Sequence, residues 1–345
     1  MNAADAMAVD CDDPSRFLVS CGAMMKKRVF VGRRIPQSAI DRLIANCDVE
    51  IWPDELPPPR DILLQKVSGC DGILSMLSDR MDGELMDVAG PQLKVISNYA
   101  VGYNNIDVAA ATKRGIQVGN TPGVLSEATA DIGVALVLAT ARRIPEGIDE
   151  VRQLKWKTWS PTAMLGLDLL GKTVGVVGMG RIGLAFARRL HFGWQMKVVY
   201  TSRSPKPDVE SELSAQRLEL GQLLEQSDIV SLHADYNPTT HHLINASTLQ
   251  RMKPSAILIN TARGGLVDQE ALFDALNQGT IWGAGLDVTD PEPLPDVSPL
   301  RTLPRCVILP HIGSSTYQTR QAMADIAVDN VLAGLSGQPL PHRVS

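Results

Sequence analysis

Three side chains that could carry out chemistry follow apolar runs in the second half of the sequence. Arg263 stands in "INTARGGLVD", Glu292 in "GLDVTDPEPLP" and His311 in "VILPHIGSS". An arginine fork can hold the carboxylate of a 2-keto acid and polarise its carbonyl, and a histidine can protonate the developing alkoxide because it titrates near neutral pH. A carboxylate hydrogen-bonded to that histidine favours the imidazolium. Together the three suit reduction of a 2-keto acid, although spacing alone does not show that they converge.

A glycine-rich turn precedes these residues. Gly178, Gly180 and Gly183 have G-x-G-x-x-G spacing between the apolar run "KTVGVV" and an amphipathic segment that begins at Arg181. The first glycine allows a tight bend, the second lets the backbone approach a pyrophosphate, and the third lets the helix pack on the strand. The helix N-terminus adds N–H donors and the positive end of its dipole. The turn therefore predicts a dinucleotide site.

The residues after the next strand bear on which dinucleotide binds. An NAD site has Asp or Glu about twenty residues after the turn, but this sequence has Arg203 and Lys206 in "KVVYTSRSPK". A guanidinium can grip a 2′-phosphate with two parallel hydrogen bonds, and no carboxylate stands there to repel that group. We expect NADPH as the preferred cofactor, with NADH possible. The alternative is that both cations are solvated loop charges.

Short β-branched runs alternate with longer segments of helical periodicity, which predicts an α/β fold of parallel βαβ units. Strands are expected at 28–32, 72–76, 94–100 and 116–120, and then at 173–178, 197–201, 228–234, 256–262, 283–288 and 306–312. One long apolar helix is expected from Ser126 to Arg143, ended by Pro145. The C-terminal helix has no strand of its own and is expected to pack back on an earlier unit.

Composition limits the class of protein. A chain of 345 residues, 44% of them hydrophobic, is too long for one core, so two domains are expected. A net charge of −5 with no basic stripe argues against nucleic acid and membrane surfaces as partners, and the longest apolar run, Ile132 to Ala141, is too short to span a bilayer. The five scattered cysteines lack a C-x-x-C pair, which predicts no disulfide framework, no metal site and a reducing, cytoplasmic location.

The first residues have neither the basic start of a secretory signal nor the acid-poor composition of a mitochondrial transit peptide. We expect residues 1–24 to be a disordered and dispensable extension, because a second start at Met24 or Met25 would precede the first strand.

Four motifs in the order "GMGRIG", "NTARGGLVD", "GLDVTDPEPLP" and "LPHIGSST" resemble the D-isomer-specific 2-hydroxyacid dehydrogenase family over nearly the whole chain after Met25. Within the family, "LKVISNYAVGYNNID", "GIQVGNTPGVL" and "WKTWSP" are most similar to the glyoxylate reductase/hydroxypyruvate reductase branch. The resemblance implies two Rossmann-like, doubly wound parallel-sheet domains with a cleft between them. A flavodoxin-like substrate domain would comprise 25–121 and 312–345, and an NAD(P)-binding Rossmann domain 122–311.

The same resemblance implies NADPH-dependent reduction of glyoxylate to glycolate and of hydroxypyruvate to D-glycerate, by a homodimer formed through the cofactor domain. Arg263, Glu292 and His311 become the catalytic residues, with His311 as the general acid. The implied cofactor-binding residues are Gly178, Gly180, Arg181, Ile182, Gly183, Arg203, Ser204, Lys206, Asp235, Thr261, Ala262, Asp287, Gly313 and Thr129. The implied substrate-binding residues are Val101, Gly102, Leu77, Arg263 and Trp159, the last reaching the partner's cleft.

Two departures from the family pattern leave alternatives open. The sequence "ADYNP" puts Asp235 near the adenine side, where a carboxylate disfavours a 2′-phosphate and would permit use of both cofactors. Asn104 stands where an acidic residue is common. Trp159 can instead pack in an interface or core. The open functions are a D-lactate-type or phosphoglycerate-type dehydrogenase, and a dinucleotide-sensing corepressor.

Overall fold

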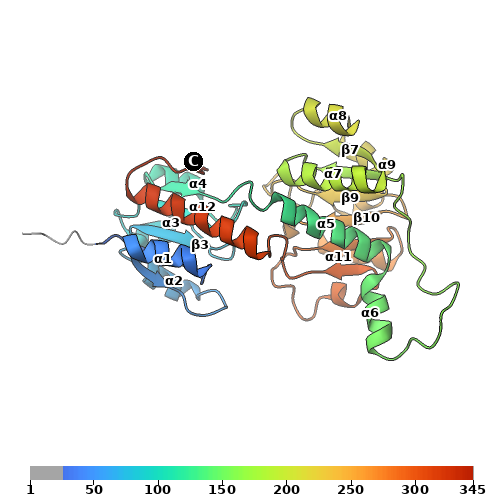
Figure 1. Ribbon diagram of the computed structural model, residues 1–345, viewed down its shortest axis with the longest axis horizontal. Helices are drawn as coiled ribbons and strands as arrows, with labels where there is room; N and C mark the ends of the chain where they lie inside the picture. The colour runs from blue at the N-terminus through green and yellow to red at the C-terminus, as the bar shows by residue number, and fades with distance from the viewer. Residues whose placement is uncertain (1–25, 345) are drawn as a thin grey trace, which may run out of the picture.

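The computed structural model describes residues 26–344, and the extension predicted at 1–24 lies outside the described residues. Two α/β lobes lie side by side along the long axis of the molecule (Figure 1). One lobe contains a five-stranded sheet and the other a seven-stranded sheet, and every strand pairing within them is parallel. The prediction of two doubly wound parallel-sheet domains is confirmed.

The smaller domain has the strand order β2-β1-β3-β4-β5, which is the flavodoxin-like order. Its strands are β1 (Arg28–Val31), β2 (Asp48–Ile51), β3 (Gly72–Ser75), β4 (Val95–Asn98) and β5 (Gln117–Gly119). Its helices are α1 (Gln37–Asn46), α2 (Arg60–Val67), α3 (Gly83–Ala89), α4 (Val108–Lys113) and α12 (Tyr317–Leu335). The central strands β3 and β4 are buried throughout because helices cover both faces. The edge strand β2 is only partly buried and has no apolar run, so the sequence did not predict it.

The larger domain has the strand order β12-β11-β10-β9-β6-β7-β8. Its strands are β6 (Thr173–Val177), β7 (Lys197–Thr201), β8 (Gln216–Arg217), β9 (Ile229–Leu232), β10 (Ile257–Asn260), β11 (Gly283–Leu286) and β12 (Cys306–Ile308). Its helices are α5 (Ser126–Ala141), α6 (Ile144–Arg152), α7 (Arg181–Trp194), α8 (Pro207–Leu213), α9 (Leu220–Gln226), α10 (Ala246–Leu249) and α11 (Gln269–Asn277), with 3-10 turns at Gly264–Leu266 and Pro299–Thr302. The strand order reverses between β6 and β9, where dinucleotides bind in this architecture. The sequence did not predict the two-residue strand β8.

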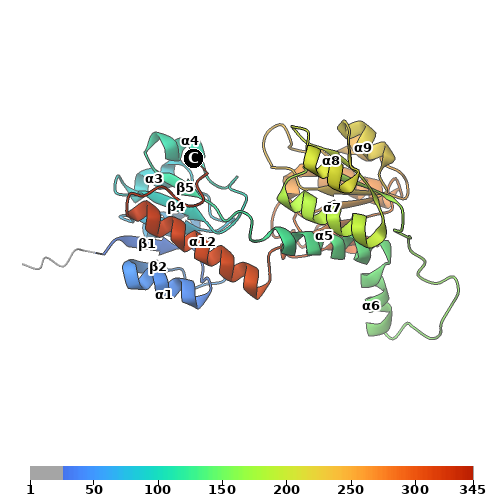
Figure 2. The ribbon, with the colours of Figure 1, turned by 45° about the horizontal axis from the view of Figure 1, so that its top comes forward.

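The chain crosses between the domains twice. Helix α5 follows β5 but packs on β10 and β11 of the larger sheet and against α7. Helix α12 follows β12 but returns to pack on β3, β4 and α1 of the smaller domain (Figures 1 and 2). The predicted return of the strandless C-terminal helix is therefore confirmed. The predicted boundaries at 121/122 and 311/312 fall in the two crossing segments.

The end predicted for the long apolar helix was wrong. Helix α5 ends at Ala141, Arg143 adopts a left-handed φ of 55°, and Pro145 lies in the first turn of α6. Proline suits a first turn because its missing N–H would have no partner there in any case. Pro145 therefore begins a new helix. No helix within residues 26–344 is long and apolar enough to cross a membrane.

A buried asparagine joins α12 to the smaller sheet. The Nδ2 of Asn330 donates to the carbonyl of Asn120 at 3.0 Å, and its Oδ1 accepts from the N–H of His342 at 3.1 Å. The side chain of Asn120 then donates to the carbonyl of Val101 at 2.8 Å. The C-terminal helix thus helps to fix a loop that follows β4.

Candidate active site

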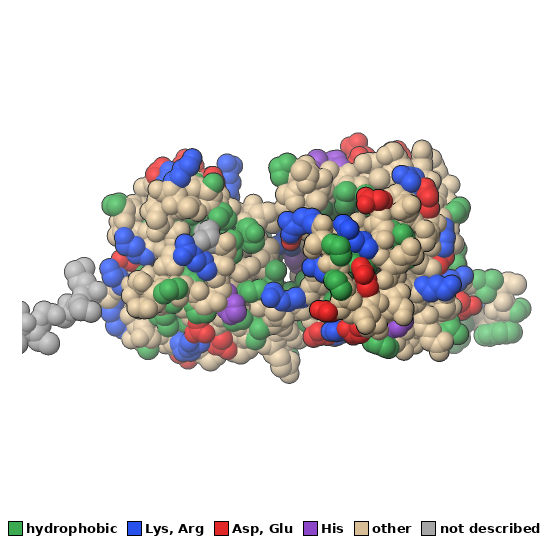
Figure 3. Space-filling model, turned by 90° about the horizontal axis from the view of Figure 1, so that it is seen from above, with side chains coloured by type: hydrophobic (Ala, Val, Ile, Leu, Met, Phe, Trp, Pro, Cys, Tyr) green, Lys and Arg blue, Asp and Glu red, His purple; other side chains and the backbone are tan. Residues whose placement is uncertain are grey.

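A cavity of about 600 Å³ lies between the two domains, beyond the carboxyl ends of strands from both sheets. Figure 3 shows the surface hollowed between the two lobes. The predicted site residues that line this cavity are Leu77, Val101, Gly102, Thr129, Arg181, Ile182, Arg203, Asp235, Thr261, Ala262, Arg263, Asp287, His311 and Gly313. Residues of both domains, far apart in the sequence, therefore line one cavity.

The other predicted site residues do not line the cavity. Glu292 contacts Nδ1 of His311. Gly178, Gly180 and Gly183 belong to the turn that leads into α7. Ser204 and Lys206 follow Arg203 in the loop between β7 and α8. Trp159 lies in the segment after α6 and is 78% exposed.

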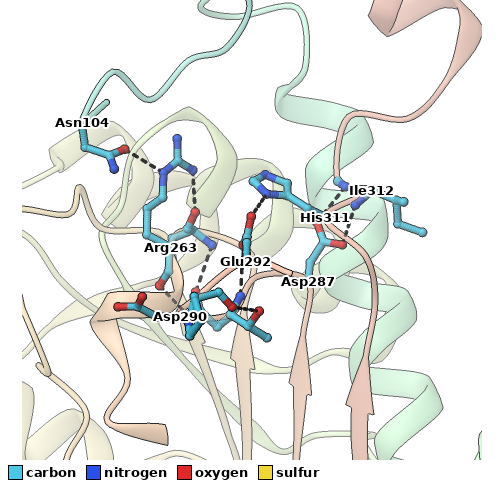
Figure 4. Close-up of polar contacts among 12 residues, drawn as sticks. Asn104, Arg263, Asp287, Asp290, Glu292, His311 and Ile312 are labelled. Atoms are coloured by element: carbon cyan, nitrogen blue, oxygen red, sulfur yellow. Dashed lines mark hydrogen bonds and ion pairs between the residues drawn. The ribbon is translucent and has the colours of Figure 1, made fainter. Parts of the chain in front are cut away.

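His311 and Glu292 form a hydrogen-bonded pair. The Nδ1 of His311 lies 2.8 Å from Oε2 of Glu292, whose Oε1 accepts the N–H of Thr289 at 3.1 Å (Figure 4). Burial alone would raise the pKa of Glu292, but the hydrogen bond and charge of His311, the Thr289 N–H and the charge of Arg263 together lower that pKa. The ionised carboxylate holds the imidazole ring in place through Nδ1. The Nε2 of His311 has no protein partner among residues 26–344, so it is available to a ligand.

A buried carboxylate fixes the backbone around His311. His311 has a φ of 54°, in the left-handed region that non-glycine residues rarely adopt. Asp287, only 1% exposed, accepts the N–H of Ile312 at 2.8 Å with Oδ1 and the N–H of Gly313 at 2.7 Å with Oδ2 (Figure 4). Burial raises the pKa of Asp287 despite these two donors. The two hydrogen bonds hold the strained turn and thereby orient the imidazole.

Arg263 is positioned by residues of both domains. Asn260, at the end of β10, accepts the N–H of Ala262 at 3.0 Å and donates to the carbonyl of Arg263 at 2.8 Å. The Nε of Arg263 donates to Oδ1 of Asn104, in the smaller domain, at 3.0 Å (Figure 4). Burial lowers the pKa of Arg263, but a guanidinium stays protonated in proteins. Because Asn104 is neutral, it orients the guanidinium without cancelling its charge.

The loop after β4 presents free backbone donors to the cavity. The carbonyl of Gly102 accepts from Asn98 at 2.8 Å, and that of Val101 accepts from Asn120 at 2.8 Å. The N–H groups of Val101 and Gly102 have no protein partner among residues 26–344, and both residues line the cavity. A Cβ at Gly102 would lie only 1.7 Å from Nη2 of Arg263. Two N–H groups and a guanidinium therefore meet where an anion can bind.

The turn after β6 fits a dinucleotide. A Cβ at Gly178 would lie 2.6 Å from the backbone of residues 233 and 234, and one at Gly183 would lie 2.4 Å from the carbonyl of Gly178. A Cβ at Gly180 would meet no atom of the described residues within 4 Å, so open space lies at the N-terminus of α7. The Oγ1 of Thr261 is buried beside the cavity and has no hydrogen-bond partner among residues 26–344. A bound cofactor would fill this space and can satisfy the orphaned hydroxyl.

The loop after β7 holds Arg203 at the mouth of the cavity. Arg217 of β8 donates through Nη2 to the carbonyl of Ser202 at 2.9 Å and to that of Arg203 at 3.4 Å. The Nη2 of Arg203 lies 3.5 Å from Oδ2 of Asp235, and these side chains are 95% and 85% exposed. So long and exposed an ion pair contributes little. The guanidinium can therefore exchange Asp235 for another anion.

The family comparisons agree with this geometry. Residues 134–313 match the family model described as D-isomer specific 2-hydroxyacid dehydrogenase, NAD binding domain, which is more than half of the chain. The chain belongs to the D-isomer-specific 2-hydroxyacid dehydrogenase family. It is 48% identical to the glyoxylate reductase/hydroxypyruvate reductase of Mus musculus, over 92% of this chain and 97% of the relative.

Solved structures of the same fold are similar over nearly their full length. A protein from Thermus thermophilus aligns with a TM-score of 0.86 and 50% identity, over 92% of this chain and 100% of that one. An NADPH-dependent glyoxylate/hydroxypyruvate reductase from Sinorhizobium meliloti, solved with NADP and malonate, aligns with a TM-score of 0.78 and 35% identity, over 93% and 97% of the two chains.

The family motifs did not single out every residue that shapes the site. Asn260 ends the buried run "ILIN", and a polar residue at the carboxyl end of a buried strand is a signal that could have found it. Arg217 lies in a two-residue edge strand that no periodicity marks. His233 also lines the cavity, but burial lowers its pKa to about 3, so it is neutral near pH 7 and does not compete with His311 as a proton donor.

We predict that Gly102→Ala weakens binding of a small 2-keto acid while leaving dinucleotide binding intact. The added methyl would displace the Arg263 guanidinium, since the two groups would lie 1.7 Å apart. Losing a hydrogen bond to a charged group raises KM about 10- to 100-fold. Initial rates give KM, and fluorescence titration with NADPH gives Kd, which should change less than about twofold because the turn after β6 is untouched.

Gly193→Ala is the matched control, because its Cβ would meet no atom within 4 Å. An unchanged KM in Gly102→Ala would contradict the close packing of Gly102 against Arg263.

Proposed function

We propose that this protein reduces small 2-keto acids, converting glyoxylate to glycolate and hydroxypyruvate to D-glycerate, with NADPH as its preferred cofactor and the cytoplasm as its location. The observation that carries the proposal is the meeting, in one cavity, of an anion-binding loop, Arg263 and the His311–Glu292 pair beside a dinucleotide turn. The names of the mouse and Sinorhizobium meliloti relatives support the choice of substrates.

The residues divide the reaction between them. The N–H groups of Val101 and Gly102 receive the substrate carboxylate, and Arg263 holds the same carboxylate and polarises the keto group. NADPH, when bound at the turn after β6, would supply the hydride for the keto carbon. His311 donates the Nε2 proton to the keto oxygen, so that hydride and proton together turn the carbonyl into a hydroxyl.

Glu292 and Asp287 support His311 in different ways. Glu292 stabilises the imidazolium before proton transfer and holds the ring through Nδ1. Asp287 acts on the backbone, because both of its oxygens accept N–H groups that follow His311. The proton donor therefore keeps one orientation while its charge changes.

The preference for NADPH rests on Arg203. We infer that a 2′-phosphate replaces Asp235 as the partner of Arg203, with Ser204 and Lys206 beside it. A phosphate dianion offers the guanidinium two charge-assisted hydrogen bonds, whereas the exposed pair with Asp235 is long, at 3.5 Å. The NADPH dependence stated for the Sinorhizobium meliloti relative supports this choice.

The homodimer would form through α6 and the segment that follows it. None of the side chains of α6 is buried, yet Ile144, Ile148 and Val151 form one apolar face at i, i+4, i+7 spacing. The exposed apolar side chains of the next segment are Leu154, Trp156, Trp159, Leu165 and Leu170. Both parts project from the larger domain (Figure 1). A second copy of the chain would cover this surface and receive Trp159 in its cavity.

We expect His311→Ala to lose about 10²- to 10⁴-fold in turnover, because the proton donor is gone, while its Kd for NADPH stays within about twofold. Stopped-flow rates and fluorescence titration measure the two quantities. Nearly normal turnover would remove His311 from the role of general acid.

Glu292→Gln keeps the shape of the partner but removes its charge, so the alkaline limb of the turnover profile should move to lower pH. A residue with only a structural role would lower turnover without moving that limb. In the unaltered enzyme, the lowered pKa of Glu292 keeps its carboxylate ionised as the pH falls from about 7 to about 5. Support for the imidazolium should thus persist through that range and be lost only below it.

Arg203→Ala should lower kcat/KM for NADPH about 10- to 100-fold and leave that for NADH nearly unchanged, since only NADPH carries the phosphate. Asp235→Asn is the matched control and should favour NADPH further, because it removes the competing carboxylate. Equal use of both cofactors, with no response to Arg203→Ala, would mean that Arg203 is a loop charge. If the unaltered protein consumes neither cofactor with any small 2-keto acid, the proposed function is wrong.

Val151→Asp should convert the dimer to a monomer in sedimentation velocity, because it buries a charge in the apolar face of α6. Trp159→Ala should keep the dimer but raise activity toward bulkier 2-keto acids such as phenylpyruvate. Trp156→Ala, on the same segment, is the control. Unaltered size selectivity in Trp159→Ala would refute the proposed reach of Trp159 into the partner's cavity.

A further inference from the structure

Arg320, in the first turns of α12, is a cation of the cavity wall with no part in the chemistry above. The wall contributed by the smaller domain and the crossing segments includes Leu77, Tyr99, Val101, Gly102, Met323 and Arg320. Within the described chain, Arg320 is the one charged side chain on this wall. All other charged side chains of the lining come from the larger domain and its last loop.

The ring of Tyr99 supports the Arg320 guanidinium. The central carbon of the guanidinium lies 6.0 Å from the centroid of the Tyr99 ring, at the outer limit of a cation–π contact. The hydroxyl of Tyr99 donates to the carbonyl of Arg320 at 2.6 Å, and burial raises the pKa of Tyr99 to about 12, so this hydroxyl stays protonated. Ring and helix are thus fixed relative to each other.

Most donors of Arg320 are unused. Its Nη2 donates to Oγ of Ser315 at 3.1 Å, and no carboxylate within residues 26–344 forms an ion pair with it. A guanidinium has five N–H donors. Arg320 lines the same cavity as the anion-binding loop. Its contact Tyr99 directly precedes Ala100 and Val101 of that loop, so a cation with spare donors lies on the same wall.

The proposed substrate pose leaves one direction for its third carbon. The carboxylate is held by Val101, Gly102 and Arg263, and the keto oxygen faces His311. The substituent on C2 then meets the remaining wall, where Leu77 and Met323 are apolar and Arg320 is the one cationic donor within residues 26–344. A hydroxyl on C3 can accept a charge-assisted hydrogen bond there, whereas a methyl group cannot.

We propose that Arg320 contacts the C3 substituent and selects 2-keto acids that carry a hydrogen-bond acceptor on C3, an inference that rests on the proposed function. Hydroxypyruvate has such a group, pyruvate has a methyl group in its place, and glyoxylate has no third carbon. Arg320 is thus a specificity-determining residue, separate from the residues that hold the carboxylate and transfer the proton.

The test compares Arg320→Met with the unaltered enzyme, using NADPH and each of hydroxypyruvate, pyruvate and glyoxylate. The ratio of kcat/KM for hydroxypyruvate to that for pyruvate should fall about 10- to 100-fold, because a hydrogen bond to a charged group is lost. The ratio of hydroxypyruvate to glyoxylate should fall in parallel. Arg320→Lys should recover part of both ratios. Arg114→Met is the control, because it removes the same charge from a position of the same domain that does not line the cavity.

Unchanged ratios in Arg320→Met would overturn the proposal, and so would an equal loss for all three substrates, which a structural or purely long-range electrostatic role predicts. If Arg320→Met unfolds at a lower temperature than the unaltered enzyme, the same two kcat/KM ratios measured in Arg320→Lys test the proposal in its place. Absence of turnover with all three substrates in the unaltered enzyme would instead defeat the proposed function itself.

Discussion

Parallel strands impose one constraint on which the whole site depends: each must return by a helix across the face of the sheet, so all loops that follow the strands emerge at one edge. The glycine turn follows β6, Arg263 follows β10, Asp287 follows β11 and His311 follows β12. Positions more than a hundred residues apart in the sequence therefore line one cavity. The reversal of strand order between β6 and β9 opens the crevice at the same edge.

The smaller domain faces this edge because the chain crosses twice. Its anion-binding loop follows β4, yet the support of that loop comes partly from the C-terminal helix, through Asn330, Asn120 and the carbonyl of Val101. Arg263, from the larger domain, reaches the smaller one. Asn104 accepts the hydrogen bond from its Nε, and Gly102 leaves room for its guanidinium. The two domains therefore build the proposed carboxylate site jointly, and neither holds all of it.

Local rules predicted the buried strands and the placement of Arg263, Glu292 and His311 at strand ends, because apolar runs and glycine spacing are visible in the sequence. They missed β2 and β8, which are short edge strands without such runs, and they misplaced the end of α5 because Pro145 suits the start of a helix as well as a stop. The contact between His311 and Glu292 depends on the turn that Asp287 holds, which no spacing rule describes. Before the structure, only the family resemblance predicted that these three residues act together in one site. The family resemblance did not point to Arg320 either, because the role proposed for this residue depends on which wall of the cavity α12 reaches.

The charges of the site are arranged so that its carboxylates do not occupy Arg263. Asp287 uses both oxygens on backbone N–H groups, and Glu292 directs one oxygen to His311 and the other to Thr289. The side chain that touches the guanidinium at Nε is the neutral amide of Asn104. A carboxylate at that position would compete with the substrate for the same cation, and in a buried site that competition is strong because the effective dielectric is low. Orientation by neutral and backbone groups thus leaves the positive charge of Arg263 for the anion that the proposed reaction must bind.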